Sequence, residues 1–191
     1  MIVATRVDER LVHGQVAVSW VAALGADCIL VANDEVSSDE TQRAILKMAK
    51  PAGCKLVIKG IDDSIAAIES GVTDKYRLFV IVKTVKDACR LARGCSKVNA
   101  INLGNVIPRE GTRQISRCVY VSPDEEKELV ELAEMGVNIE IRSLPGDKAL
   151  RLVEALWIFG RSGIIAREER LDGHLANFSH CVFQLLQLVS R

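Results

Sequence analysis

The chain has 191 residues, of which 49% are apolar and 26% charged, a balance typical of a globular protein and not of a disordered one. This length favours one domain with a substantial core. The 25 lysine and arginine residues are balanced by 25 aspartate and glutamate residues, so the chain lacks the excess of positive charge that is typical of nucleic-acid-binding proteins. Any anion site must therefore be built by a few local arginines.

Short apolar runs, which predict buried strands, alternate along the chain with segments of helical spacing. The predicted strands are residues 2–5, 28–32, 55–59, 78–82, 98–103, 114–121 and 137–142. The predicted helices are residues 15–24, 39–50 with Asp39 as N-cap, 62–71 opened by Asp62 or Asp63, 85–93, 122–136 with Ser122 as N-cap, and 145–159 opened by Pro145. Residues 107–113 are expected to form a turn or bulge.

Repeated strand–helix units with continuously apolar strands indicate an α/β fold. We expect an open, mostly parallel sheet with helices on both faces and an antiparallel edge strand. One domain is expected over residues 1–159. Residues 160–191 contain a helix break and a charged patch, so we treat them as a C-terminal appendage for which the sequence predicts no definite structure.

The sequence has no feature typical of a secreted or membrane protein. Its first apolar run soon meets charged residues, unlike a secretory leader, and no later stretch reaches the roughly 18 apolar residues of a spanning helix. The six cysteines are scattered without a CxxC pair, so we expect small buried side chains in a reducing cytosol and no zinc site. They are Cys28, Cys54, Cys89, Cys95, Cys118 and Cys181.

His13 is the only histidine in the first 173 residues. It lies between the first predicted strand and the first predicted helix, in a segment that also holds Arg6 and Arg10. In an open α/β sheet this edge is where ligands bind. A helix start also offers unpaired N–H groups and a positive dipole end, which suit phosphate. The segment therefore has the features of a phosphohistidine site.

A neutral imidazole is a good phosphoryl acceptor, and the phosphorylated ring can pass its group on. The charges of Arg6 and Arg10, with the helix start, disfavour the protonated ring and stabilise the transferring phosphoryl group. We assign the closer role to Arg10, three residues before His13. Arg6 could instead pair with a nearby carboxylate such as Asp8.

Further groups at this edge are candidate phosphate ligands. The backbone N–H groups of Gly14 and Gln15 could cradle phosphate. Asp8 could accept a hydrogen bond from the ring or orient the loop. Thr84 follows the fourth predicted strand and could donate a hydroxyl hydrogen bond to phosphate.

Each of these residues also has a plainer interpretation. A lone histidine beside a helix start is often a cap or a satisfied surface group, and Thr84 is more often a helix cap than a ligand. Arg6 and Arg10 with their acidic neighbours could form an ordinary surface ion-pair cluster. A metal is indicated only weakly, by the tail residues His174, His180 and Cys181.

The segment from Arg6 to Val16, followed by Trp20, resembles the signature of the mannose/sorbose-family IIB component of the bacterial phosphotransferase system. The similarity covers residues 1–157, and the histidine segment is its most specific part. It continues through residues 31–36, Asp39, 48–51, 53–55, 83–84, 87–88, 102–105, 114–116, 136–137, Pro145 and 147–148.

The resemblance implies a phosphohistidine carrier and sugar phosphotransferase. Such proteins take a phosphoryl group from a IIA partner on the loop histidine, here His13, through Nδ1. They pass it to a sugar brought in by membrane-embedded IIC and IID partners. The family's loop arginine corresponds to Arg10, its loop aspartate to Asp8 and its phosphate-facing hydroxyl to Thr84.

The same resemblance sets the expected surroundings of the protein. The sugar would belong to the mannose, fructose, sorbose or amino-sugar class, and no metal or nucleotide is expected as cofactor. The protein would be cytoplasmic, peripherally associated with its transporter, and a homodimer, since family members commonly pair. Two departures stand out: Val85 replaces a proline that the family commonly has, and residues 160–191 have no counterpart there.

Two other classes of function compete with this one. A regulatory or binding module of the same fold would need a damaged histidine loop, and this loop is intact. A nucleotide-binding α/β enzyme would carry a Gly-rich phosphate turn after its first strand, and none is present there.

Overall fold

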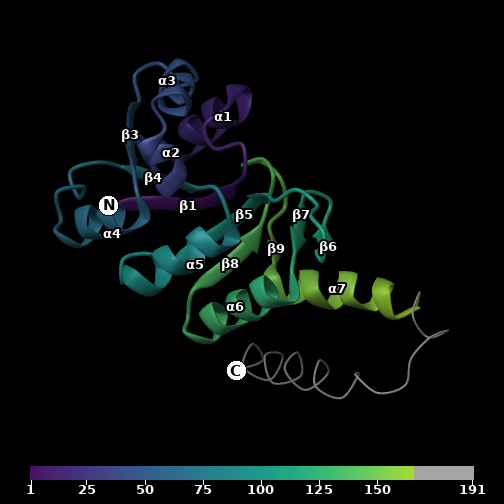
Figure 1. The fold of residues 1–191 in the computed structure, drawn as a ribbon. Coiled ribbons are helices and arrows are strands. Elements are labelled where there is room, and N and C mark those ends of the chain that lie inside the picture. The colour runs from purple at the N-terminus through teal and green to yellow at the C-terminus, as the bar shows by residue number, and fades with distance from the viewer. Residues whose placement is uncertain (166–191) are drawn as a thin grey trace.

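The computed structural model describes residues 1–165, apart from the side chains of residues 15–16 and 160–165. Within residues 1–165 the chain forms a main sheet of seven strands in the order β3-β2-β4-β1-β5-β8-β9 (Figure 1). The strands are β1 (Ile2–Asp8), β2 (Cys28–Ala32), β3 (Lys55–Lys59), β4 (Leu78–Val82), β5 (Ala100–Asn105), β8 (Asn138–Ile141) and β9 (Leu150–Arg151). Neighbouring strands are parallel except β8 and β9, so the predicted sheet with an antiparallel edge strand is confirmed.

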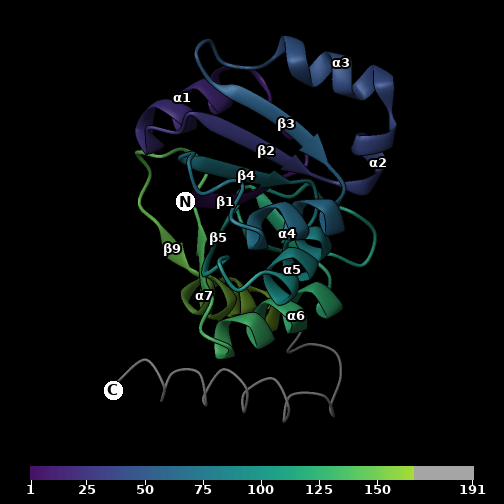
Figure 2. The ribbon, with the colours of Figure 1, turned by 90° about the vertical axis from the view of Figure 1, so that its left-hand side faces the viewer.

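Helices cover both faces of this sheet, as predicted (Figure 2). One apolar layer lies under α1 (Gly14–Leu24), α2 (Asp34–Ser38) and α3 (Glu40–Met48). The other lies under α4 (Ile61–Glu69), α5 (Val85–Gly94), α6 (Pro123–Glu134) and α7 (Leu152–Ile165). Strands β2 and β4 are buried along their whole length between the two layers, which explains their continuous apolar runs.

The predicted strand over residues 114–121 is wrong, because this segment folds into a hairpin. β6 (Arg113–Ser116) and β7 (Val119–Val121) pair antiparallel, outside the main sheet. Ser116 Oγ accepts a hydrogen bond from the N–H of Cys118 at 3.3 Å, a local contact that stabilises the turn between them.

The predicted start of the last helix, at Pro145, is also wrong, because α7 begins at Leu152. Asp147 accepts a hydrogen bond from the N–H of Leu144 at 2.8 Å, and its own N–H donates to the carbonyl of Leu144 at 3.1 Å. These contacts close a turn around Pro145, after which β9 returns to pair with β8. α7 then continues to Ile165, while His174, His180 and Cys181 lie outside the described residues.

Four of the cysteines are buried, as predicted, and Cys118 is half-buried. Burial raises the pKa of the Cys89 thiol to about 12, so this side chain behaves as a small neutral core group.

Candidate functional site

The centre of the sheet positions the histidine loop. β1 lies between β4 and β5 and ends at Asp8. The connection after β1 leads to α1 on one face, whereas the connection after β4 leads to α5 on the other. Where connections diverge in this way, a crevice opens beyond the carboxyl ends of the strands. Residues 9–13, Thr84 and Asn105 share this edge of the sheet.

Local contacts fix the backbone of the loop. The N–H of Leu11 donates to the carbonyl of Asp8 at 2.8 Å, and the N–H of Glu9 donates to the carbonyl of Asn105 at 3.0 Å. Leu11 has a φ of 56°, in the left-handed region that a leucine rarely adopts. Its side chain and that of Val12 are buried beside α1, so packing holds the loop in this conformation.

Asp8 is the centre of the site, with a side chain that is 1% exposed. Its Oδ1 accepts hydrogen bonds from the backbone N–H of Arg10 at 3.2 Å and from Arg10 Nε at 3.3 Å. Its Oδ2 accepts one from Arg6 Nη2 at 3.0 Å, and Nε2 of His13 lies 3.5 Å from the same oxygen. One buried carboxylate thus faces three of the predicted site residues.

His13 occupies the N-cap position of α1, but its side chain makes no capping hydrogen bond. Its Nε2 is buried and has no hydrogen-bond partner among the described residues, although 26% of the side chain is exposed. The exposed surface of the ring therefore lies away from Nε2.

The first turn of α1 remains open to an anion. It contains no acidic residue, and its N-terminal N–H groups, including those of Gly14 and Gln15, have no partner within the helix. Nothing lies within 4 Å of the point where a Cβ on Gly14 would stand, so a phosphoryl group can approach the backbone there.

The two arginines differ sharply in exposure. The Arg10 side chain is 53% exposed, and within the described part of the chain only its Nε is held, by Asp8. Arg6 is 2% exposed, and its guanidinium donates to several protein acceptors, Asp8 among them. Burial lowers the pKa of Arg6 from its ordinary value, and the charge of Asp8 opposes that shift. The ion pair between Arg6 and Asp8 is therefore part of the core and not a surface cluster.

Thr84 is the N-cap of α5. Its Oγ1 accepts a hydrogen bond from the N–H of Asp87 at 3.0 Å, and Asp87 Oδ2 accepts one from the N–H of Thr84 at 3.3 Å. The same carboxylate oxygen accepts a hydrogen bond from Asn33 Nδ2 at 3.0 Å. Accepting a bond as a cap leaves the hydroxyl proton of Thr84 able to donate, so the capping role does not exclude a phosphate contact.

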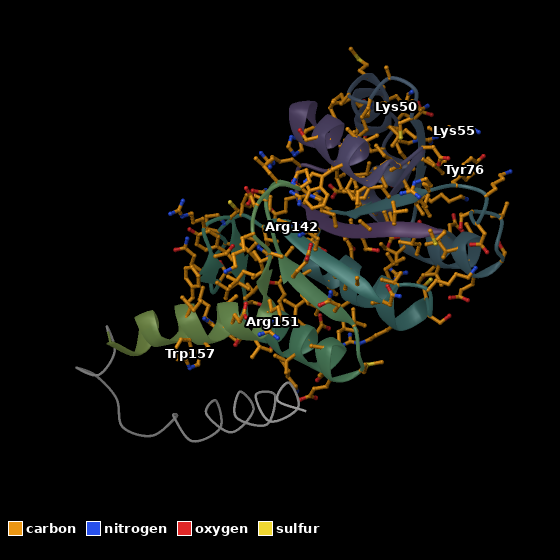
Figure 3. All side chains as sticks on the ribbon, turned by 180° about the vertical axis from the view of Figure 1, so that it is seen from behind. Lys50, Lys55, Tyr76, Arg142, Arg151 and Trp157 are labelled. Carbon is orange, nitrogen blue, oxygen red and sulfur yellow. The ribbon has the colours of Figure 1, made fainter. Side chains whose placement is uncertain are left out.

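Sequence reasoning did not predict which groups surround Arg6. Trp20 is fully buried, and its Nε1 donates to the carbonyl of Ser143 at 3.1 Å. Arg142, which Figure 3 labels, follows β8, and Ser143 comes next in the chain. The backbone carbonyls of both residues accept hydrogen bonds from Arg6. Their only signal in the sequence is that β8 ends at the same edge of the sheet as β1.

The sequence gives independent information on this site. Residues 2–160 match the family model described as PTS system sorbose subfamily IIB component. PTS stands for phosphotransferase system. The chain belongs to this IIB family.

Relatives and solved structures agree with this assignment. A probable phosphotransferase enzyme IIB component of Streptococcus pyogenes is 41% identical over 160 residues, which cover 80% of this chain and 97% of the relative. An N-acetylgalactosamine-specific IIB component of Escherichia coli is 34% identical, covering 81% and 98%. The IIB domain of the sorbose permease from Klebsiella pneumoniae superposes with a TM-score of 0.78 at 25% identity, covering 83% and 97%.

Two further observations describe this IIB component. In the portion that the structure describes, no helix is long and apolar enough to cross a membrane. Over the same residues, no group of histidine, cysteine and carboxylate side chains is arranged to hold a metal ion.

Proposed function

We propose that this IIB component accepts a phosphoryl group on Nδ1 of His13 from the histidine of a IIA partner and passes it to a sugar. The observation that carries the proposal is the contact between Asp8 and the ring. Asp8 Oδ2 faces Nε2 at 3.5 Å, and such separations often shorten to a full hydrogen bond once the reacting partner is bound. A ring held through Nε2–H keeps a lone pair on Nδ1.

The first transfer conserves both charge and protons. The Nδ1 lone pair of His13 forms a bond to phosphorus as the N–P bond of the donor phosphohistidine breaks, with its electron pair going to the donor nitrogen. The donor ring, protonated on its other nitrogen, leaves as neutral imidazole. His13 keeps its Nε2 proton and takes up the positive charge, which the buried carboxylate of Asp8 stabilises.

Three groups then stabilise the phosphoryl oxygens. Arg10 has an exposed guanidinium in the same loop, and its planar fork suits phosphate oxygens. The N–H groups of Gly14 and Gln15 begin α1, and Thr84 can donate its hydroxyl proton.

The second transfer goes to a sugar hydroxyl. The oxygen attacks phosphorus, the N–P bond breaks and returns its electron pair to Nδ1, and the hydroxyl proton passes to water. We propose that the sugar is held by membrane-embedded IIC and IID partners and belongs to the mannose, fructose, sorbose or amino-sugar class. The names of relatives include N-acetylgalactosamine, sorbose and mannose. Metal and nucleotide have no part in this scheme, because the donor is itself a phosphohistidine.

The boundary between the IIB domain and the C-terminal appendage at residue 159 is also a proposal. The family match ends at residue 160, although α7 continues to Ile165.

Radioactive transfer tests the proposal. The chain is incubated with labelled phosphoenolpyruvate, the general phosphotransferase proteins and a IIA partner, and acid-labile label is then measured on it. The chain has three histidines, so His174→Ala and His180→Ala are matched controls for His13→Ala. We expect label on wild type and both controls and none on His13→Ala. Equal labelling of His13→Ala would refute the assignment.

Sugar transfer separates the main proposal from its alternative. Adding membranes that contain IIC and IID, with each candidate sugar in turn, should discharge the labelled chain and yield sugar phosphate. A chain that takes up label but discharges to no sugar would favour a regulatory module of the same fold.

A further inference from the structure

Arg6 is the residue whose surroundings depart most from its predicted role as a phosphate ligand. Its Nη1 donates to Asn102 Oδ1 at 2.6 Å and to the carbonyl of Arg142 at 3.0 Å. Its Nη2 donates to Asp8 Oδ2 at 3.0 Å and to the carbonyl of Ser143 at 3.2 Å. Both terminal nitrogens are therefore engaged by protein acceptors, and the side chain is 3% exposed.

The space around this guanidinium is shaped for it. A Cβ on Gly104 would stand 1.9 Å from Arg6 Cζ, so only glycine leaves room for the side chain to pass β5. Arg6 Cζ also lies 4.8 Å from the centre of the Trp20 ring, within the range of a cation–π contact. Gly104 and Trp20 thus restrict the position of the guanidinium in addition to its hydrogen bonds.

This fixed guanidinium sets the orientation of Asp8. It binds Oδ2, whereas Arg10 binds Oδ1 through its backbone N–H and Nε. With both oxygens bound in this way, the carboxylate cannot rotate freely, and Oδ2 is held 3.5 Å from Nε2 of His13. Because the tautomer of a histidine is set by the hydrogen bond that its other nitrogen makes, a fixed Oδ2 favours the ring with its proton on Nε2.

We propose that Arg6 is a positioning residue, which holds Asp8 so that His13 carries its proton on Nε2 and presents Nδ1 to phosphorus. This inference rests on the proposed function, and it replaces direct phosphate binding by Arg6 with an action through Asp8. It also makes the turn after β8 a supporting part of the site, because the carbonyls of Arg142 and Ser143 hold the same guanidinium.

Two variants remove this support by different routes. Arg6→Met removes the guanidinium, and Gly104→Ala leaves Arg6 in the chain but displaces it. Arg113→Met is the matched control, because Arg113 also donates to a buried carboxylate, from Nε to Glu126 Oε2 at 2.8 Å, but it lies on β6, outside the main sheet. Thermal unfolding and circular dichroism identify which variants fold, and either test variant suffices.

The decisive readout is the ¹⁵N chemical shift pattern of the His13 imidazole, which distinguishes the two neutral tautomers. We expect the Nε2–H tautomer in wild type and Arg113→Met, and a mixture in Arg6→Met and Gly104→Ala. Phosphoryl uptake by the two test variants should fall by about 10- to 100-fold, the scale of a misplaced reacting group. In an Asp8→Asn background, Arg6→Met should have little further effect on that rate.

The possible failures can be told apart. If wild type is not labelled on His13, the proposed function itself fails. If wild type is labelled and both folded test variants keep its tautomer and its rate, Arg6 has no positioning role. A lower rate with an unchanged tautomer, undiminished in the Asp8→Asn background, would also overturn the inference and return Arg6 to direct phosphate contact.

Discussion

Arg10 Nε lies 3.3 Å from Asp8 Oδ1, and this contact joins an arginine side chain that is 53% exposed to a carboxylate that is 1% exposed. Nε of Arg10 is therefore held by the buried carboxylate of Asp8, while the rest of the guanidinium is available to a ligand. This arrangement suits the proposed role of Arg10, which is to contact the phosphoryl oxygens during both transfers.

Replacing Arg10 by alanine should slow phosphoryl transfer with little effect on stability. Loss of a charged donor to a developing anion costs on the order of 100-fold in rate. A partly exposed ion pair contributes up to about 1 kcal/mol to the free energy of unfolding. Rapid-quench labelling measures the rate, and urea unfolding measures stability. Arg10→Lys should recover part of the rate, whereas an unchanged rate in Arg10→Ala would remove this residue from the site.

Replacing Leu11 by glycine tests what holds the loop. The left-handed φ of 56° costs about 1 kcal/mol or more for a leucine, and glycine relieves it. Burying the leucine side chain contributes about 1.5–3 kcal/mol, which glycine loses. Burial outweighs strain, so we expect Leu11→Gly to lower the free energy of unfolding by about 1 kcal/mol. A more stable variant in urea unfolding would show that strain dominates.

The two roles of Thr84 can be separated by substitution. Aspartate is as good an N-cap as threonine, but it cannot donate to phosphate and it repels the anion. We therefore expect Thr84→Asp to fold normally and transfer more slowly, whereas Thr84→Ser should retain both properties. Labelling rates and thermal unfolding of the pair check this expectation. Wild-type transfer by Thr84→Asp would leave Thr84 as a cap alone.

Asp34 gives the fold a component of stability that depends on pH. The N–H of Ile61 donates to its carboxylate and holds its pKa below the ordinary value, and a hydrogen bond from Arg90 adds to this shift. A lowered folded-state pKa contributes stability above the unfolded value, about 3.9, and that stability is lost as the pH falls through the folded value. Asp34→Asn should therefore be less stable at pH 7.

The difference in the free energy of unfolding between wild type and Asp34→Asn, and its decrease at low pH, test this prediction. Asp34 is largely exposed, so solvent screening limits the difference to below about 1 kcal/mol. Urea unfolding of wild type and Asp34→Asn at pH 7, 5 and 3 should show a difference that is constant at pH 7 and 5 and smaller at pH 3. A difference that does not decrease below pH 4 would have a cause other than the ionised carboxylate.

Local patterns in the sequence were enough to predict the parallel sheet and the place of the histidine loop. Continuous apolar runs marked β2 and β4, and a lone histidine between a strand and a helix marked the site. The hairpin over residues 113–121 was missed because its turn, at Arg117 and Cys118, contains neither glycine nor proline to mark a break in the predicted strand.

The supports of the site were beyond local patterns. Arg6 was expected to face phosphate, and its burial depends on Asn102 and on the turn at residues 142–143, which lie far along the chain. Only the register of β1 with β5, and of β5 with β8, brings these groups together. The room that Gly104 leaves for Arg6 is likewise a property of the folded sheet.

The most direct test of the account is the identity of the atom that carries phosphorus. The chain, labelled with ¹⁵N in its histidines, is phosphorylated by its IIA partner, and one-bond ³¹P–¹⁵N coupling then identifies the nitrogen. The account predicts coupling to Nδ1 of His13, with the proton on Nε2 facing Asp8. Phosphorus on Nε2 of His13, or on any other residue, would contradict it.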